Sequence, residues 1–213
     1  MLAKNFKSTF LSCEKDQEKI WKALFIDSRP YSDILKRLLI VNTPDCLDTS
    51  QKQYQIAIDS KDLKTLRDEG YIGVTPQLIF NEHEQVKSYI ILEFDDFFPS
   101  ANPSYRNCSV SFTIVCHLDC WELDDYKLRP HQIAGYIDGI LNKSKLSGIG
   151  ELNFVGATTF ALDDKLGGIL LKYSATHGNE DEEHINPNMP SVQEQGVINT
   201  KLDVPNSPPD YLY

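Results

Sequence analysis

The sequence predicts an α+β fold, in which a mixed, mainly antiparallel sheet carries one packed helix. Three observations lead to this prediction. Residues 109–121 alternate apolar and polar side chains with period two, which is typical of a half-buried strand. Residues 129–141 place apolar side chains at helical spacing, so that one stripe of the helix is apolar. Residues 151–160 and 169–176 then have the composition of two returning strands.

The strand at 109–121 and the helix at 129–141 supply the predicted core. We expect the helix to begin at Arg129-Pro130, because proline is tolerated in a first helical turn. One face of the strand carries Val110, Phe112, Ile114, Cys116, Leu118 and Cys120. At the centre of the core we expect Phe112, Ile114, Cys116, Ile133, Ile137 and Leu141.

Two helices are predicted before the sheet. Ser12 is a capping residue, and the apolar pairs at 20–21 and 24–25 recur at helical spacing. A second start signal at Ser28-Arg29-Pro30 precedes another apolar stripe, which ends at Asn42-Thr43-Pro44.

The segment between the helices and the central strand is predicted to contain short elements. Residues 54–58 alternate as a short strand, and residues 61–70 form one or two helical turns closed by a glycine. Residues 77–80 and 86–94 make a hairpin, whereas the prolines in residues 95–107 predict a loop.

We expect a single α+β domain over residues 1–177, with a helical part at 1–45 and a sheet-forming part at 54–177. From Gly178 the composition shifts to acidic residues and then to prolines with little apolar periodicity. Residues 178–213 are therefore expected to form an extended or disordered arm, ordered only where it lies on another surface.

Charge and cysteine content restrict the class of protein. The net charge of −10 argues against a general nucleic-acid-binding surface, because neutralising phosphates requires clustered Lys and Arg. An acidic protein can still surround DNA if the duplex has to pass without binding. An odd number of scattered cysteines fits free thiols in a reducing compartment: Cys13, Cys46, Cys108, Cys116 and Cys120. We see no secretion signal, and no apolar run has the roughly 18 residues that a membrane helix needs.

The cysteines and histidines of the central stretch could bind a metal or form a thiol nucleophile, but the spacing of the cysteines fits buried core residues better. Zinc binding would use Cys108, Cys116, His117 and Cys120. However, Cys116 and Cys120 would lie about 13 Å apart on a strand that rises roughly 3.3 Å per residue, too far for one tetrahedral site. A thiol nucleophile would pair one of these two cysteines with His131 or His177, but the strand period buries both thiols.

Carboxylate pairs occur at Asp95-Asp96, Asp124-Asp125 and Asp163-Asp164, where they could bind a divalent ion or act as acid and base. Each pair falls in a predicted turn, where such pairs are commonly solvated. We therefore expect no catalytic residue, no metal and no cofactor.

Subunit contacts are the remaining role for several residues of the central stretch. Gly135 and Gly139 each cost about 1 kcal/mol of helix propensity against alanine, which close packing on the sheet or on a neighbouring subunit would explain. Arg129 is either a surface charge or an ion-pair partner, across subunits, of the turn at Asp124 and Asp125. These five residues are candidate interface residues.

Four segments of the chain carry a resemblance to a known family. They are Phe112-Thr113-Ile114-Val115-Cys116, Arg129-Pro130-His131-Gln132-Ile133-Ala134, Gly148-Ile149-Gly150-Glu151-Leu152-Asn153-Phe154 and Gly168-Ile169-Leu170-Leu171-Lys172-Tyr173. In these segments the chain resembles the neck proteins of tailed bacteriophages, and is most similar to the tail-terminator (tail-completion) or head-tail joining group.

The resemblance implies a non-catalytic α+β subunit of a homo-oligomeric ring, with six or twelve copies, between portal and tail. Such a ring surrounds the DNA path without sequence-specific binding, contacts neighbouring portal, neck and tail proteins but no membrane, and belongs to the virion after assembly in the host cytoplasm. The arm agrees with this, because Tyr211 and Tyr213 are aromatic residues that could anchor in a neighbour's pocket.

Two functions of other classes remain open from the sequence. One is a small intracellular hydrolase that uses the Cys/His pairs or the Asp-rich turns. The other is a monomeric binding module that recruits a partner through its C-terminal arm.

Overall fold

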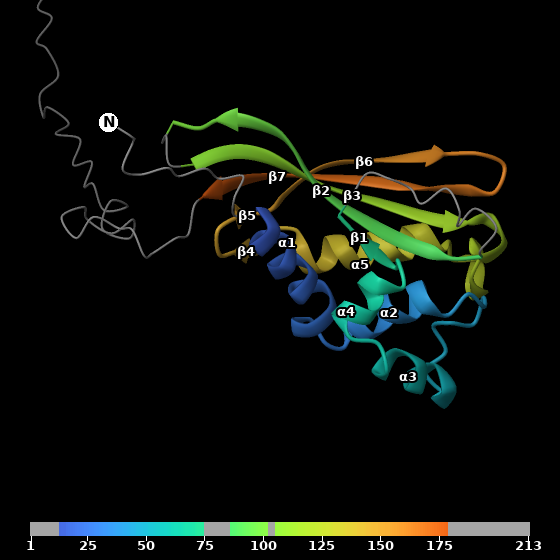
Figure 1. The fold of residues 1–213 in the computed structure, drawn as a ribbon. Helices are drawn as coiled ribbons and strands as arrows, with labels where there is room; N and C mark the ends of the chain where they lie inside the picture. Colours follow the sequence, from blue (N-terminus) through green and yellow to red (C-terminus); the bar gives the residue numbers. More distant parts are fainter. Residues whose placement is uncertain (1–12, 75–85, 102–104, 179–213) are drawn as a thin grey trace, which may run out of the picture. The chain divides into compact units, whose positions relative to one another are not determined.

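The computed structural model describes residues 13–74, 86–101 and 105–178, all within one compact unit that spans residues 1–180. The fold is α+β, as predicted: a mixed five-stranded sheet has the order β1-β2-β3-β7-β6, and the described helices lie on one of its faces (Figure 1). The predicted arm lies, apart from Gly178, outside the described residues.

The helices and short helical turns follow the chain in this order: α1 Cys13–Lys22, η2 Ala23–Asp27, α2 Tyr31–Ile40, α3 Lys52–Asp59, α4 Leu63–Asp68, η4 Leu118–Cys120, η5 Asp124–Tyr126 and α5 Arg129–Leu141. The strands are β1 Ile72–Gly73, β2 Ser88–Pro99, β3 Tyr105–His117, β4 Lys145–Leu146, β5 Gly150–Glu151, β6 Asn153–Ala161 and β7 Leu166–Gly178.

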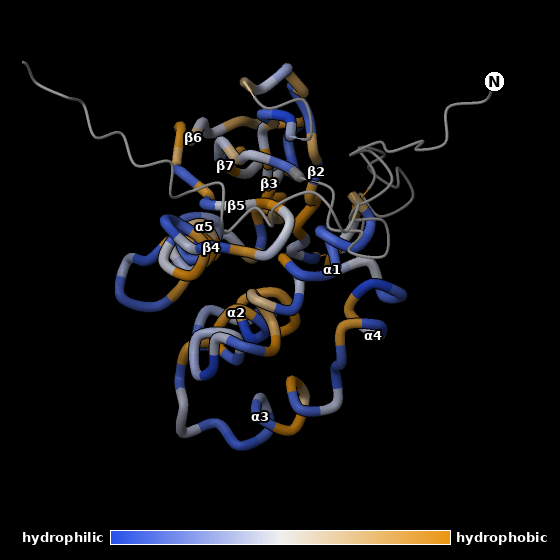
Figure 2. The backbone as a smooth tube through the Cα atoms, turned by 90° about the vertical axis from the view of Figure 1, so that its left-hand side faces the viewer, coloured by the Kyte–Doolittle hydropathy of each residue, from blue (hydrophilic) through white to orange (hydrophobic). Residues whose placement is uncertain are grey.

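The layers are visible when the molecule is turned (Figure 2). The strands β6, β7, β3 and β2 form one layer, α5 and α1 come next, and α3 lies farthest from the sheet. The sheet is antiparallel except where the short β1 runs parallel to β2 at Ile90 and Ile91. This mixed, mainly antiparallel sheet is the one predicted.

The two N-terminal helices form where they were predicted. The apolar pairs of the first helix are buried, Ile20 and Trp21 in α1 and Leu24 and Phe25 in η2. The helix α2 buries Leu35, Leu38 and Leu39. Both helices therefore use the apolar stripe that the sequence pattern indicates.

The short strand predicted next is wrong, because these residues form α3. Tyr54 and Ile58 are four residues apart and share one helix face, so their spacing fits a helix as well as a strand. Ile58 is buried, whereas Ile56 is largely exposed. Tyr54 donates its hydroxyl to the Asp45 carboxylate at 2.8 Å, which ties α3 to the preceding turn.

The loop predicted at residues 95–107 is also wrong in part, since β2 continues to Pro99. A bulge between Asp95 and Phe98 interrupts the ladder with β3 before pairing resumes. Proline is tolerated there because it stands at the end of the strand. The first strand of the predicted hairpin, residues 77–80, lies outside the described residues.

The central strand is as long as predicted but lies four residues earlier in the chain, since it begins at Tyr105 and ends at His117. The chain then tightens into η4, where the Asp119 backbone N–H donates to His117 Nδ1 at 3.1 Å. Leu118 is consequently 46% exposed rather than part of the core, while Cys120 is buried.

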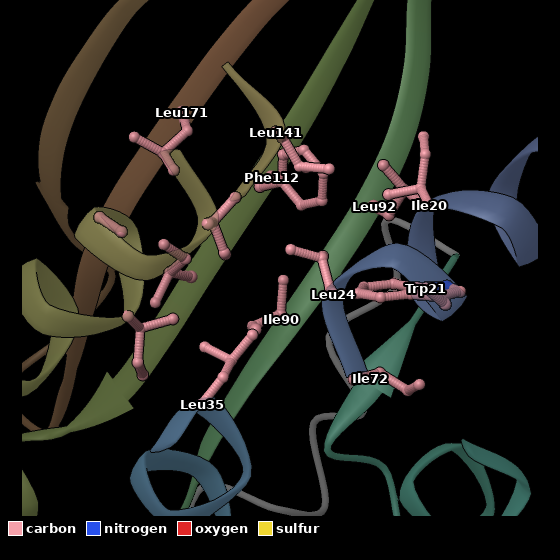
Figure 3. Close-up of a cluster of buried hydrophobic side chains, with 14 of the residues drawn as sticks. Ile20, Trp21, Leu24, Leu35, Ile72, Ile90, Leu92, Phe112, Leu141 and Leu171 are labelled. Atoms are coloured by element: carbon pink, nitrogen blue, oxygen red, sulfur yellow. The ribbon is translucent and has the colours of Figure 1, made fainter. Parts of the chain in front are cut away.

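The core lies between the sheet and the helices (Figure 3). All six residues expected at its centre have fully buried side chains: Phe112, Ile114, Cys116, Ile133, Ile137 and Leu141. A row of edge-on aromatic contacts crosses this layer from α1 to β6, with ring centroids 6.4, 5.9 and 5.8 Å apart along Trp21, Phe112, Tyr173 and Phe154. The row links the buried core to an edge strand.

Glycines shape the last two strands. The predicted kink at Gly156 is a bulge between β6 and β7, and the predicted bend contains Gly148 and Gly150 with φ values of 85° and 73°. At Gly168 an added Cβ would stand 1.7 Å from the carbonyl oxygen of Ile114, so only glycine fits beside β3.

Candidate functional site

Arg129 is an internal clamp, which corrects the prediction that it lies at the surface or at a subunit interface. Its side chain is 0% exposed. The guanidinium donates to four backbone carbonyls: Cys120 at 2.6 Å, Leu38 and Val41 at 2.7 Å, and Thr43 at 3.0 Å. Carbonyls at a helix C-terminus have no partner within the helix, so Arg129 caps the end of α2 and joins it to the start of α5.

The acidic turn next to Arg129 faces solvent. Asp124 and Asp125 are exposed in η5, and Asp125 forms an ion pair with Lys127 at 3.3 Å. The following Tyr126 is fully exposed. This turn therefore remains available as a contact surface, although Arg129 is not its partner.

Gly135 and Gly139 lie on the exposed face of α5. A Cβ at either position would meet no atom within 4 Å. The expectation that they allow α5 to pack closely on the sheet is wrong, because the sheet contacts the opposite stripe of the helix, which includes Ile133 and Ile137. Contact with a neighbouring subunit stays a prediction.

The strand β6 forms one edge of the sheet and pairs, among the described strands, only with β7. It carries exposed apolar side chains, with Phe154 45% and Val155 60% exposed. An edge strand with unpaired backbone groups and apolar side chains is a template for pairing with another chain. This edge is the clearest surface for self-association in the described part of the chain.

The opposite edge of the sheet is formed by β2, which is covered in part by a short strand. The short β1 covers β2 only at Ile90 and Ile91, and the described residues provide no further strand partner on that side. Phe98, near the end of β2, is 60% exposed. The register places Phe98 and Phe154 toward the same end of the sheet, beside the beginning of β3.

Acidic and hydroxyl side chains gather on β2 and β3. Lys172 of β7 pairs with Asp96, which holds the pKa of that carboxyl below its usual range. Ser109 donates to Asp96 at 3.3 Å. Burial, together with the nearby Asp95 carboxylate, raises the pKa of Glu93. The Asp95-Asp96 pair thus lies in the β2 bulge rather than in the predicted turn.

The thiol pairs considered from the sequence do not form. Cys116 and Cys120 are buried, and desolvation raises the pKa of Cys116 to about 12, whereas His131 lies on an exposed position of α5. His177 is buried, but it lies 3.5 Å from Cys13. Within the described residues, no cluster of His, Cys, Asp and Glu side chains has the arrangement of a metal site.

Sequence reasoning missed the group around His177, which also contains Asp16. The Asp16 carboxylate lies 3.0 Å from His177. A usable signal was the Cys13-x-x-Asp16 spacing, which brings both side chains to one side of a predicted helix. Its histidine partner is 164 residues away in sequence, a separation that local patterns do not report.

Comparison with known proteins identifies the family. The family model YomW matches residues 32–175, more than half of the chain. A crystal structure of a protein from Akkermansia muciniphila has a TM-score of 0.27 and 9% sequence identity, with 81% of this chain and 98% of that chain covered. No curated protein matches. In the described part of the chain, no helix is both long enough and apolar enough to cross a membrane. The chain belongs to the YomW family, a name of Bacillus phage (SPbeta-like) origin, and is therefore a phage-associated protein.

Proposed function

We propose that this protein is a structural subunit of a homo-oligomeric ring in the neck of a tailed-phage virion. The ring joins the head and portal to the tail and surrounds the DNA path. Membership of a phage-associated family and the resemblance of the central stretch to neck proteins support this proposal. The observation that carries it concerns the two edges of the sheet: among the described residues β6 has no strand partner beyond β7, and β2 has one beyond β3 only at Ile90 and Ile91.

A closed ring needs a heterologous interface, in which one surface of a subunit contacts a different surface of the next. Successive antiparallel pairings make β6 run opposite to β2. If the ring axis runs roughly along the strands, β6 of one subunit meets β2 of the next in antiparallel orientation. The sheet would then continue from subunit to subunit.

The side chains at these edges suit such a contact. Phe154 and Val155 on β6, and Phe98 on β2, all lie toward one end of the sheet, so that they would meet across the junction. Strand addition supplies backbone hydrogen bonds, and apolar side chains at the same end supply buried area and register.

The acidic composition of the protein is compatible with a ring that surrounds DNA without binding it. With a net charge of −10, the protein lacks the clustered cations that would hold phosphates, so a duplex can pass without sticking. The exposed turn at Asp124 and Asp125, and the exposed helix face at Gly135 and Gly139, are further contact surfaces in this proposal. Tyr211 and Tyr213, proposed as anchors on a neighbour, lie outside the described residues.

Sedimentation analysis of the purified full chain, combined with negative-stain images, tests the proposal. We expect a ring of defined copy number, and a shift toward monomer in Val155→Lys, because a charge there opposes strand addition. Ile56→Lys is the matched control: it removes an apolar side chain on α3 that is also largely exposed, away from both edges, and should leave the ring intact. A monomer at all concentrations that is also absent from virions would overturn the proposal.

A further inference from the structure

Three ionisable side chains from distant parts of the chain meet where α1 packs against the end of β7. Cys13 begins α1 and is partly exposed, while Asp16, one turn later, is 1% exposed and His177 is 0% exposed. Cys13 Sγ lies 3.5 Å from His177 Nε2, and Asp16 Oδ2 lies 3.0 Å from His177 Nδ1. The imidazole therefore stands between a thiol and a carboxylate.

The surroundings of the ring indicate which nitrogen carries the proton. His177 Nδ1 lies 3.4 Å from the carbonyl oxygen of Gly148, which can only accept a hydrogen bond. In the neutral imidazole the proton is consequently on Nδ1, which leaves the lone pair of Nε2 facing Cys13. The thiol of Cys13 can donate to that lone pair.

The carboxylate is placed to stabilise the charged ring. Asp16 Oδ1 pairs with Lys19 at 3.1 Å, whereas Asp16 Oδ2 accepts no hydrogen bond within the described residues. Its distance of 3.0 Å from Nδ1 favours an imidazolium once a proton arrives at Nε2. Phe94 stacks on the ring with centroids 5.8 Å apart and shields it from water.

The other four cysteines have a different environment. Cys46, Cys108, Cys116 and Cys120 are all buried. Desolvation raises the pKa of Cys46 and raises the pKa values of Cys108 and Cys116 to about 12. Buried thiols of this kind are inert, because the thiolate is the nucleophile. Cys13 is the cysteine that combines exposure with a base in contact.

We propose that Cys13 is a nucleophilic thiol that exchanges with small disulfides, with His177 as its base and Asp16 as a positioning residue. His177 Nε2 takes the thiol proton, and Cys13 Sγ attacks one sulfur of the disulfide. A new S–S bond forms on Cys13 as the S–S bond of the reagent breaks, and the departing thiolate takes the proton from His177. Cys13 is thereby oxidised to a mixed disulfide while the reagent is reduced to one thiol. The site is thus a modification site at the junction of α1 and β7.

Oxidised glutathione is the probe for this reaction with the full-length protein. Mass spectrometry of peptides should find the first adduct on Cys13, formed faster in the native protein than in protein denatured in urea at the same pH. In His177→Gln the rate near neutral pH should fall about a hundredfold, and the rate should depend more steeply on pH, because the base is gone. Cys13→Ser should give no early adduct.

Circular dichroism and thermal melting establish that each variant is folded. If His177→Gln does not fold, the Asp16→Asn variant tests the assignment instead. It removes the negative charge beside Nδ1 but keeps the shape of the side chain. A changed pH–rate profile in Asp16→Asn supports the assignment. Equal adduct formation on all five cysteines, a native rate no faster than the denatured rate, or an unchanged profile in a folded variant of His177 or Asp16 would overturn it.

Discussion

The guanidinium of Arg129, at the first residue of α5, donates a hydrogen bond of 2.7 Å to the carbonyl oxygen of Leu38 near the end of α2. These residues are 91 positions apart in sequence. The same Nη1 also reaches Val41, so one buried cation satisfies the end of one helix from the beginning of another. The contact holds the N-terminal helical part to the central helix.

Replacement of Arg129 should be among the most destabilising single changes. Arg129→Leu leaves buried carbonyls unsatisfied, which costs about 1–3 kcal/mol for each group that water cannot reach. We expect a loss of more than about 3 kcal/mol in the free energy of unfolding, measured by urea denaturation. Arg67→Leu, at an exposed position of α4, is the control and should change stability little. Similar urea midpoints for the two variants would contradict the stabilising role of Arg129.

A charge on the core stripe of α5 should prevent folding. Ile137 is fully buried, and an unpaired buried carboxylate in Ile137→Asp costs several kcal/mol. Ile137→Val keeps the site apolar and should cost only about 0.5–1.5 kcal/mol. Circular dichroism and thermal unfolding distinguish the two variants. A cooperatively melting Ile137→Asp protein would show that the helix register is wrong.

Alanine substitutions at two glycines should change the stability of the fold in opposite directions. Gly139→Ala adds a methyl group in open space on an exposed helix face, so it should stabilise the monomer by up to about 1 kcal/mol. Gly168→Ala drives a methyl group into the backbone of β3 and should destabilise or prevent folding. Thermal unfolding of both variants checks this, and destabilisation by Gly139→Ala would indicate that α5 packs differently.

Stability should fall at acid pH, in part through the N-cap of α4. The Asp62 carboxylate accepts hydrogen bonds from the backbone N–H and the hydroxyl of Thr65, both at 2.7 Å, and these bonds lower its pKa from 3.8. A carboxyl with a lowered pKa stabilises the fold above its unfolded pKa. That contribution is lost as the pH falls from about 3.8 through the lower folded value. Asp62→Asn keeps a cap without a titrating group, so its urea midpoint should depend less on pH in this range. Identical pH slopes would contradict the role of Asp62.

Local patterns predicted much of the fold. The strand and helix of the central stretch, both N-terminal helices, the bend at Gly148 and the bulge at Gly156 follow from periodicity and glycine placement over a few residues. The prediction of a strand in place of α3 was wrong because the spacing of Tyr54 and Ile58 fits one face of a strand as well as one face of a helix. The end of β2 was missed because Pro99 suggested a loop, although pairing with β3 overrides that preference.

The roles of individual side chains were harder to predict, since they depend on contacts that are distant in sequence. Arg129 is next to an acidic turn in the chain, yet three of its four carbonyl partners belong to α2 and the residues that follow it. Cys13 and His177 likewise meet only after the sheet has formed. Periodicity reports which face of an element is apolar but not which element covers it.

Imaging of tagged virions tests the central claim most directly. If this chain is a neck subunit, virions that carry an epitope-tagged copy should show antibody label, in negative stain, only at the junction between head and tail. Virions that lack the protein, or label on the capsid shell or along the tail tube, would contradict the account.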